Sequence, residues 1–320
     1  MLQSIWEDVK KEFNYGNMVS RIIIVNVSVF VAITLFSLIL RVAHGWDFPM
    51  DLYLSVRNFF LISSSWWHNL THPWVFITSM FMHEDFWHIL WNMLFLFWFG
   101  RIVGDFIGDH RILPIYLLGG LAGNIVFSIV IPLITASEGG PVFALGASGA
   151  VMAIALASAV LSPNYIIRLL LIGDVRLKYV VGVLLFLDLF FISRDNNTGG
   201  HFAHLGGAFM GWVFVARLRE GHDLSEPVNR VLKAIRGFFK SPFKTTFRQK
   251  KGPKVAYRNP VKTTATGGRS AQTKGSRASD SDKDLSYQEQ LDAILDKIKQ
   301  SGYDSLTREE KEFLFNASKE

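Results

Sequence analysis

Long apolar runs constrain the fold of this chain more than any other feature. Residues 22–40 contain no charged side chain, and a helix needs about 20 predominantly apolar residues to cross the hydrocarbon core of a bilayer. Half of the 320 residues are apolar and only 19% are charged, which indicates an integral membrane protein. Because the first run is long and lies far from Met1, we expect an anchor that stays in the membrane rather than a cleaved signal peptide.

Six such segments predict an all-α integral membrane protein with six transmembrane helices. Their approximate ranges are 21–42, 86–107, 112–133, 147–162, 178–193 and 201–217. Basic residues precede the first segment and lie between the second and third and between the fourth and fifth, whereas 134–145 and 195–200 have none. Because basic residues favour the cytoplasmic side, we expect cytoplasmic termini and an outer, aromatic-rich loop over 43–82 at the membrane interface.

The chain outside the predicted core, 21–218, divides by composition into four further segments. Residues 1–20 are predicted to be a cytoplasmic N-terminus, and 219–244 a basic amphipathic helix on anionic lipid, with an ordinary solvated helix as the alternative. Residues 245–284 predict a disordered linker. Residues 285–320 predict a small helical hairpin that would serve an unidentified cytoplasmic partner, its second helix opened by a capping box of Thr307 and Glu310. The net charge of +6 is concentrated in the part of the chain after Arg217, so it does not indicate nucleic-acid binding.

Polar residues inside membrane helices are functional candidates, because their transfer into lipid is unfavourable. They gather at the starts of the second, fourth and sixth predicted spans: His83, His88 and Asn92; Ser148; and His201 and His204. In the predicted topology these three spans all run from outside to inside. We therefore expect the polar groups to converge near the outer face.

Ser148 is the candidate nucleophile. A serine needs a base to become nucleophilic, and histidine is its usual partner, so His204 or His201 could serve. Small residues on both helices, Gly146 and Gly149 near the serine and the G-x-x-x-G pair that begins with Gly207, would let two backbones approach closely.

The second span offers candidate oxyanion donors. His88 and Asn92 are four residues apart and share one helix face. They could donate hydrogen bonds to an oxyanion together with the free backbone N–H groups at the start of the fourth span.

The same residues have other interpretations. A serine among glycines in a membrane helix is usually a packing residue. A zinc protease needs two histidines one turn apart, but His83 and His88 lie about 140° apart around a helix. His201 and His204 have no evident third metal ligand, so no metal site is predicted. A soluble hydrolase elbow needs a glycine where Ala150 stands. The absence of cysteine excludes disulfides and thiol catalysis.

Three motifs resemble those of the rhomboid intramembrane serine proteases. HEDFWHILWN is similar to the H-x(4)-H-x(3)-N motif of their second span, GASGA to the nucleophile motif of their fourth, and HFAHLGGAFMG to the A-H-x-x-G motif of their sixth. The resemblance covers about residues 15–218 and implies a six-helix rhomboid-like bundle.

The resemblance also implies an activity. Ser148 and His204 would form a dyad without a third carboxylate, with His88, Asn92 and the Ser148 N–H as the oxyanion hole. His83 would be structural support and His201 accessory. No cofactor is implied. The implied substrates are single-span membrane proteins cut near their outer end, and similar helical tails on bacterial relatives indicate a bacterial inner membrane.

The sequence departs from the family pattern at two positions. Val75 follows Trp74 where many members have a Trp-Arg pair, and Met152 stands where some have a tyrosine that stacks on the catalytic ring. Asp188, near the outer end of the fifth span, could reach the level of the polar cluster, either in a catalytic role or as a structural hydrogen-bond partner.

Two rival classes of function remain. A catalytically idle rhomboid-like protein would bind transmembrane helices as a chaperone or adaptor, but such relatives usually lose the serine or the histidine, and both are present here. A transporter would need charged groups at mid-membrane and internal repeats, and neither is evident. We therefore predict an intramembrane serine endopeptidase.

Overall fold

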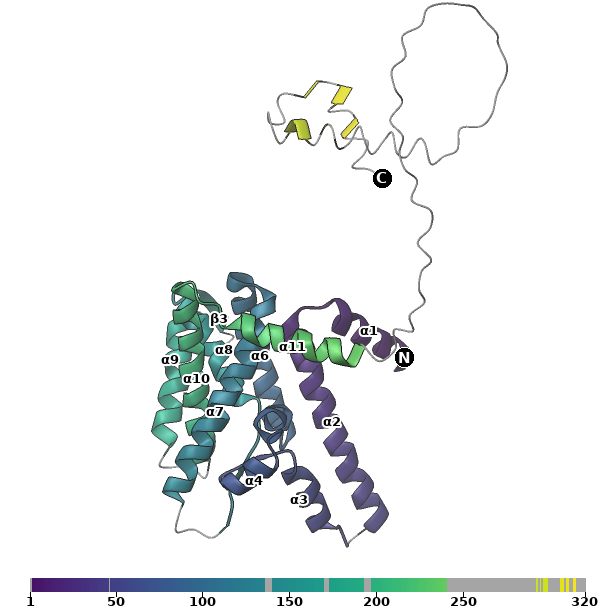
Figure 1. The fold of residues 1–320 in the computed structure, drawn as a ribbon, viewed down its shortest axis with the longest axis vertical. Coiled ribbons are helices and arrows are strands. Elements are labelled where there is room, and N and C mark those ends of the chain that lie inside the picture. Colours follow the sequence, from purple (N-terminus) through teal and green to yellow (C-terminus); the bar gives the residue numbers. More distant parts are fainter. Residues whose placement is uncertain are drawn as a thin grey trace, which may run out of the picture. The chain divides into compact units, whose positions relative to one another are not determined.

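The computed structural model describes residues 2–45, 47–135, 140–169, 173–192 and 197–240, and some positions between 292 and 314. The chain divides into two units, Met1–Phe247 and Arg248–Glu320. The helices of the first unit (Figure 1) are α1 (Leu2–Tyr15), α2 (Met18–His44), α3 (Met50–Asn58), α4 (Trp66–Thr71), α5 (Val75–Thr78), α6 (Phe86–Ile107), α7 (Ile112–Ile134), α8 (Ser148–Leu161), α9 (Leu177–Phe191), α10 (Thr198–Arg219) and α11 (Ser225–Lys240).

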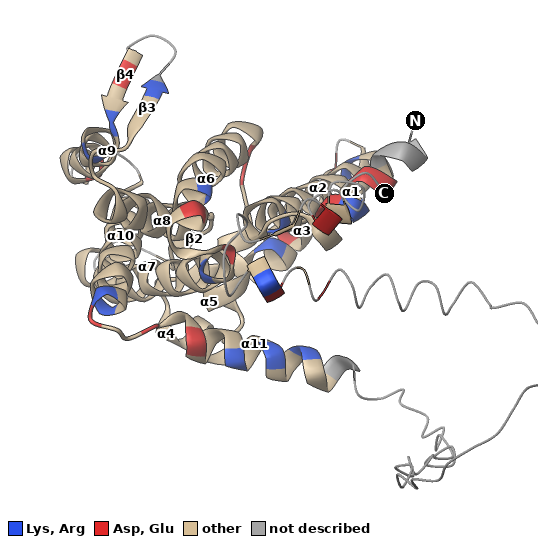
Figure 2. Cartoon of the chain, turned by 90° about the horizontal axis from the view of Figure 1, so that it is seen from above, with Lys and Arg blue, Asp and Glu red and all other residues tan. Residues whose placement is uncertain are grey.

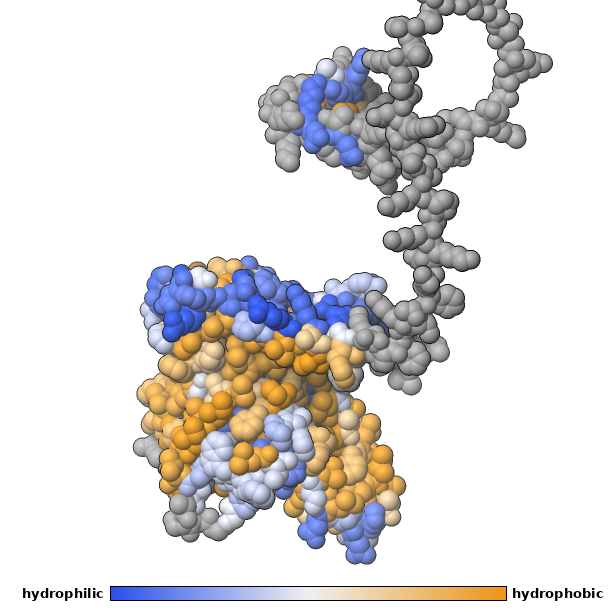
Figure 3. Space-filling view, in the orientation of Figure 1, coloured by the Kyte–Doolittle hydropathy of each residue, from blue (hydrophilic) through white to orange (hydrophobic). Residues whose placement is uncertain are grey.

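A helix lies at each of the six ranges predicted to span the membrane, so the predicted helical membrane class is confirmed. Among the described residues, three helical segments are long and apolar enough to cross a bilayer, Met18–His44, Phe86–Ile107 and Asp109–Ile134, and α8 is a shorter apolar helix. Figure 3 shows the corresponding apolar band over this unit, with hydrophilic residues at the end where α1 and α11 lie. Six crossings are compatible with this arrangement and stay a prediction.

The chain also forms short strands that the sequence did not predict. β1 (Ile62–Ser63) pairs antiparallel with β2 (Phe143–Ala144), and β3 (Ile166–Leu169) pairs antiparallel with β4 (Gly173–Arg176). The β3–β4 hairpin projects away from the helices in Figure 2 and carries an exposed ion pair between Arg168 and Asp174. The β1–β2 pair ties the outer segment to the chain just before Ser148.

The outer segment is folded, although it was expected only to lie along the interface. It contains α3, α4, α5 and the short 3-10 helix η1 (Ser79–Phe81). A second short 3-10 helix, η2 (Asp109–Arg111), lies between α6 and α7. Asn69 donates to the carbonyl of Ser63 at 2.7 Å and accepts from its N–H at 3.0 Å. The indole of Trp74 donates to the Phe59 carbonyl at 2.8 Å, and Val75 is fully buried. These contacts hold the loop without the Trp-Arg pair.

The central helix is α8, which packs against α6, α7 and α10. Ten of its 14 residues are buried, as expected of a helix that is apolar on all sides. Fourteen residues span only about 21 Å, less than the roughly 30 Å of a hydrocarbon core. A helix this short that reaches the inner surface must begin below the outer one, and Ser148 is its first residue.

Small residues bring α10 against α8. A Cβ on Gly207 would collide with the carbonyl oxygen of Gly149, and a Cβ on Gly211 with that of Ala153. Both contacts advance by four residues along both helices, so α8 and α10 run parallel, as predicted. Their starts therefore lie at one level.

The opposite end of the bundle carries α11. The Arg111 guanidinium contacts Asp223 Oδ2 at 2.7 Å, and Asn229 donates to the His110 carbonyl at 3.2 Å. Partial burial alone would raise the pKa of Asp223, but the hydrogen bonds from Ser225 and Arg111 hold it below its ordinary value. Figure 2 shows Lys and Arg along α11, beside the exposed side chains of Val231, Ile235 and Phe238.

The second unit is described at few positions. Thr307 N–H donates to Glu310 Oε2 at 2.7 Å and Glu310 N–H to Thr307 Oγ1 at 3.3 Å, the reciprocal pattern of the predicted capping box. Lys297 pairs with Glu310 at 2.8 Å. The predicted linker, 245–284, lies outside the described residues.

Candidate active site

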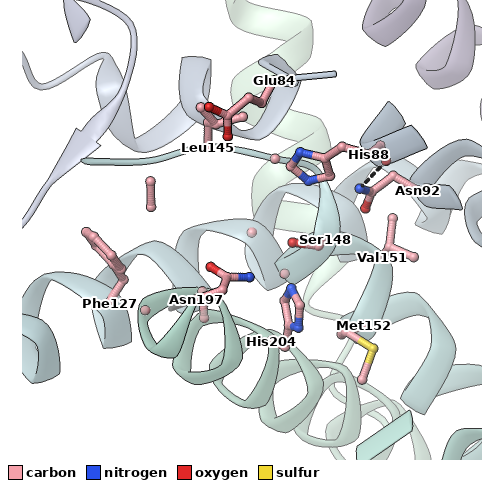
Figure 4. Close-up of a pocket in the computed structure, with 18 of the residues that line it drawn as sticks. Glu84, His88, Asn92, Phe127, Leu145, Ser148, Val151, Met152, Asn197 and His204 are labelled. Atoms are coloured by element: carbon pink, nitrogen blue, oxygen red, sulfur yellow. Dashed lines mark hydrogen bonds between the residues drawn. The ribbon is translucent and has the colours of Figure 1, made fainter. Parts of the chain in front are cut away.

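One cavity of about 790 Å³ brings together residues from α6, α8, α9 and α10. His88 and Asn92 of α6, Ser148 of α8, Asp188 of α9 and His204 of α10 all line it. Figure 4 shows the side chains of His88, Ser148 and His204 around a common space. Groups up to 116 residues apart in the sequence, from His88 to His204, thus meet in one pocket.

The loop before Ser148 depends on Gly146. Its φ is +123°, a conformation that side chains rarely adopt. A Cβ at this position would also lie 2.8 Å from His88 Nε2. Gly146 therefore allows both the turn into α8 and the approach of the His88 ring to the serine.

His83 contacts the same loop. It is 5% exposed, and its Nε2 accepts a long hydrogen bond, 3.4 Å, from the N–H of Ala147. Its ring meets that of His88 edge to face, with centroids 5.1 Å apart. Burial, and then the neighbouring His88, lower the pKa of His83 to about 4. A neutral ring at physiological pH can accept this hydrogen bond.

The candidate oxyanion donors lie above the serine. Asn92 is buried, and its amide donates one hydrogen bond to the carbonyl of His88 at 2.9 Å, which leaves its second N–H for another acceptor. Because Ser148 begins α8, the first backbone N–H groups of that helix have no partner within the helix. These donors can stabilise a negative charge that develops near Ser148 Oγ.

His204 is held by a carboxylate. Its Nδ1 lies 2.8 Å from Asp188 Oδ1, and Nδ1 of His201 lies 2.8 Å from the same oxygen. A carboxylate only accepts, so both Nδ1 atoms carry a proton and Nε2 of His204 is the basic nitrogen. Ser148 and His204 form no hydrogen bond in the described part of the chain; such bonds are often long until substrate binds.

Asp188, His201 and His204 are also the residues that could hold a metal. Their ligand atoms lie within 4.8 Å of one another. Asp188 thus supplies the third ligand that the sequence did not reveal. The two distances of 2.8 Å are those of charge-assisted hydrogen bonds, whereas a metal would lie roughly 2.0–2.2 Å from each ligand atom.

The structure adds pocket residues that the sequence analysis missed. Asn197, at the N-cap of α10, makes no capping hydrogen bond with its side chain, which faces the pocket in Figure 4. Glu84 lines the outer side. Met152 also lines the pocket, so it is near the position from which a tyrosine would stack. Of the residues that the sequence analysis missed, Asn197 alone could have been found from the sequence, because asparagine is a preferred residue at the start of a helix.

The fold and the pocket define a helical integral membrane protein with a polar site at the starts of its parallel helices. The model of the rhomboid domain matches residues 70–221, and a family of unknown function (DUF6576) matches 281–320. The mitochondrial RHOMBOID-like protein 12 of Arabidopsis thaliana is 34% identical over 155 residues, which cover 45% of this chain and 46% of that protein.

Two proteins of Bacillus subtilis (strain 168) are also similar. The putative rhomboid protease YdcA is 30% identical over 43% of this chain and 64% of its own length. The rhomboid protease GluP is 26% identical over 51% of this chain and 28% of its own. The chain therefore covers less than two thirds of each of these relatives. Residues 70–221 match the rhomboid domain, and together with these rhomboid-named relatives the match supports a rhomboid family protein.

Proposed function

We propose that the protein is an intramembrane serine endopeptidase with Ser148 as nucleophile and His204 as base. The observation that carries the proposal is the pocket itself: Ser148 and His204 line one cavity at the starts of tightly packed parallel helices. The Nδ1 of His204 is engaged by Asp188, so Nε2 is the nitrogen left to take a proton.

The reaction would follow the course of other serine hydrolases. Ser148 Oγ attacks the peptide carbonyl carbon while its proton passes to His204 Nε2. His88, Asn92 and the first N–H groups of α8 stabilise the oxyanion. The C–N bond then breaks, and His204 gives the proton to the leaving amine. Water, activated by the same nitrogen, releases the acyl group and regenerates Ser148.

The site lies where a membrane-embedded peptide could reach it. Trp87 and Trp91 of α6 and Leu184 and Leu187 of α9 line the cavity. Trp87 and Trp91 are 64% and 51% exposed, so an apolar surface continues from the pocket to the outside of the helices. The substrates proposed from this arrangement are single-span membrane proteins, cut near their outer ends.

The other parts of the proposal concern location and the tail. The named relatives come from a mitochondrion and from bacteria, and we propose a bacterial inner membrane for this chain. The apolar face of α11, with Arg230 and Lys233 beside it, suits a surface of anionic lipid. The 285–320 segment would bind a cytoplasmic partner.

Cleavage in a reconstituted membrane tests the proposal. Wild-type protein in liposomes would be mixed with single-span reporters that carry a small residue near the outer end, and products would be sized by mass spectrometry. Wild type should cleave at one site and Ser148→Ala should not. Ser28→Ala serves as the control, because Ser28 lies in α2, where its hydroxyl donates to the Ile24 carbonyl of the same helix. Binding of reporters without cleavage would instead favour an idle rhomboid-like protein.

A further inference from the structure

The buried carboxylate of Asp188 is the feature that the dyad mechanism leaves unexplained. It lies on α9, whose sequence LKYVVGVLLFLDLFF has no other acidic residue, and it is 7% exposed. A charge in a membrane helix is unfavourable unless it is paired or hydrogen-bonded, and such residues are usually functional. The partners of Asp188 therefore indicate what it does.

Both partners come from α10. One oxygen, Oδ1, accepts from Nδ1 of His204 and from Nδ1 of His201, each at 2.8 Å. The two rings are nearly perpendicular, at 88°, with centroids 6.0 Å apart. The histidines are three residues apart on one helix, so their side chains are neighbours on its surface and both can reach the same carboxylate.

We infer that Asp188 is a positioning residue for His204 and that His201 holds Asp188 in place. This inference rests on the proposed function. The carboxylate fixes the proton of His204 on Nδ1, orients the ring and stabilises the imidazolium that forms when Ser148 gives up its proton. The machinery would then be a serine, a histidine and a carboxylate, with His201 as a fourth member, rather than a dyad.

The orientation of α9 about its own axis places Asp188 next to the two histidines. Asp188 reaches α10 because α9 turns this face toward α10, whereas side chains on its other faces are exposed: Val183 56%, Phe186 61% and Leu189 59%. A helix in contact with lipid can keep its apolar side chains outward and place its one carboxylate toward the protein interior.

The test combines a rate and a spectroscopic signal. Labelling by a fluorescent fluorophosphonate measures the acylation of serine. Asp188→Ala should label about 10- to 100-fold more slowly than wild type, a part of the roughly 10²–10⁴-fold that acid–base catalysis contributes. Asp188→Asn should be at least as slow, because its amide can donate to Nδ1 and favour the wrong tautomer. The matched control is Asp174→Asn, which removes an exposed carboxylate and should label as wild type.

The tautomer of His204 is read independently of activity. Nitrogen NMR of histidine-labelled protein, with the His204 signal assigned by its loss in His204→Ala, should show the proton on Nδ1 in wild type. In Asp188→Ala the signal should shift toward the Nε2–H form. His201→Gln should slow labelling less than either Asp188 variant, since it removes only the support of the carboxylate.

The outcomes separate this inference from the proposed function. If wild type does not label, the proposed function fails, and the tautomer still decides whether Asp188 orients His204. If wild type labels and both Asp188 variants match it in rate and tautomer, the inference is overturned. If a chelator abolishes labelling and Zn²⁺ restores it, the three residues form a metal site and the inference is likewise overturned. A misfolded Asp188→Ala leaves Asp188→Asn, of nearly equal size, to give both readouts.

Discussion

Acid should weaken the fold through His83. Its folded pKa is about 4 because of burial and then the neighbouring His88, against about 6.5 for an unperturbed histidine. Between these values the unfolded chain binds the proton and the folded chain does not. The contribution of neutral His83 to the free energy of unfolding is therefore fully present above about pH 6.5 and falls as the pH drops toward 4. The window follows from the lowered folded pKa.

The size of the effect follows from the same two values. At pH 5 the unfolded histidine is almost fully protonated and the folded one almost wholly neutral, which lowers the free energy of unfolding by about 2 kcal/mol relative to pH 7.5. Protonation in the folded state would also replace the acceptor of the Ala147 N–H by a donor. The loop before Ser148 would then loosen.

Unfolding by SDS from a mild detergent, followed by tryptophan fluorescence, measures this difference. The variant His83→Gln keeps an acceptor but cannot titrate, so its free energy of unfolding should fall by about 2 kcal/mol less than that of wild type between pH 7.5 and 5. His222→Gln, at an exposed position, controls for the loss of a histidine. An equal fall in wild type and His83→Gln would refute the reasoning.

Three further perturbations test the packing, the oxyanion site and the attachment of α11. Gly207→Val should destabilise the fold by about 1–3 kcal/mol or more through overpacking against α8, whereas Gly182→Val, where a Cβ meets nothing within 4 Å, should unfold as wild type does in the same SDS titration. Asn92→Ala should slow fluorophosphonate labelling or peptide cleavage by about 10²-fold, as expected for one oxyanion donor, without lowering the unfolding midpoint; an unchanged rate would remove Asn92 from the site. Arg111→Ala should destabilise by roughly 1–2 kcal/mol at neutral pH, and the loss should shrink as the pH falls through the lowered pKa of Asp223, because the protonated acid no longer pairs; a pH-independent loss would contradict the ion pair.

The helices and the approach of α10 to α8 could be predicted, because both depend on local patterns. Apolar runs of sufficient length indicate where helices lie. The spacing of Gly207 and Gly211 against the small residues after Ser148 indicates which faces meet. The structure shows both features.

The contact of Asp188 with His201 and His204 could not be predicted. Residues 177–191 are apolar on every side apart from Lys178 and Asp188, so the sequence contains no periodic signal for the rotation of α9. That rotation depends on packing with α8 and α10. His201, expected to be accessory, contacts the same carboxylate as the candidate base.

The pairing of β1 with β2 was missed for a different reason. Ile62 faces Ala144 across 82 positions of sequence, and each strand has only two residues. Strands this short show no alternation. The folded outer segment follows from side-chain hydrogen bonds, such as those of Asn69 with Ser63, whose partners hydropathy does not reveal.

The most direct measurement of the central claim is the reaction of purified, detergent-solubilised protein with a fluorescent fluorophosphonate. Wild type, Ser148→Ala and His204→Ala would be compared. Circular dichroism would verify folding, and an active rhomboid protease that reacts with the same probe would be the positive control. The account predicts that wild type labels and that neither variant does. Absence of labelling in folded wild type, or labelling that persists in Ser148→Ala, would contradict it.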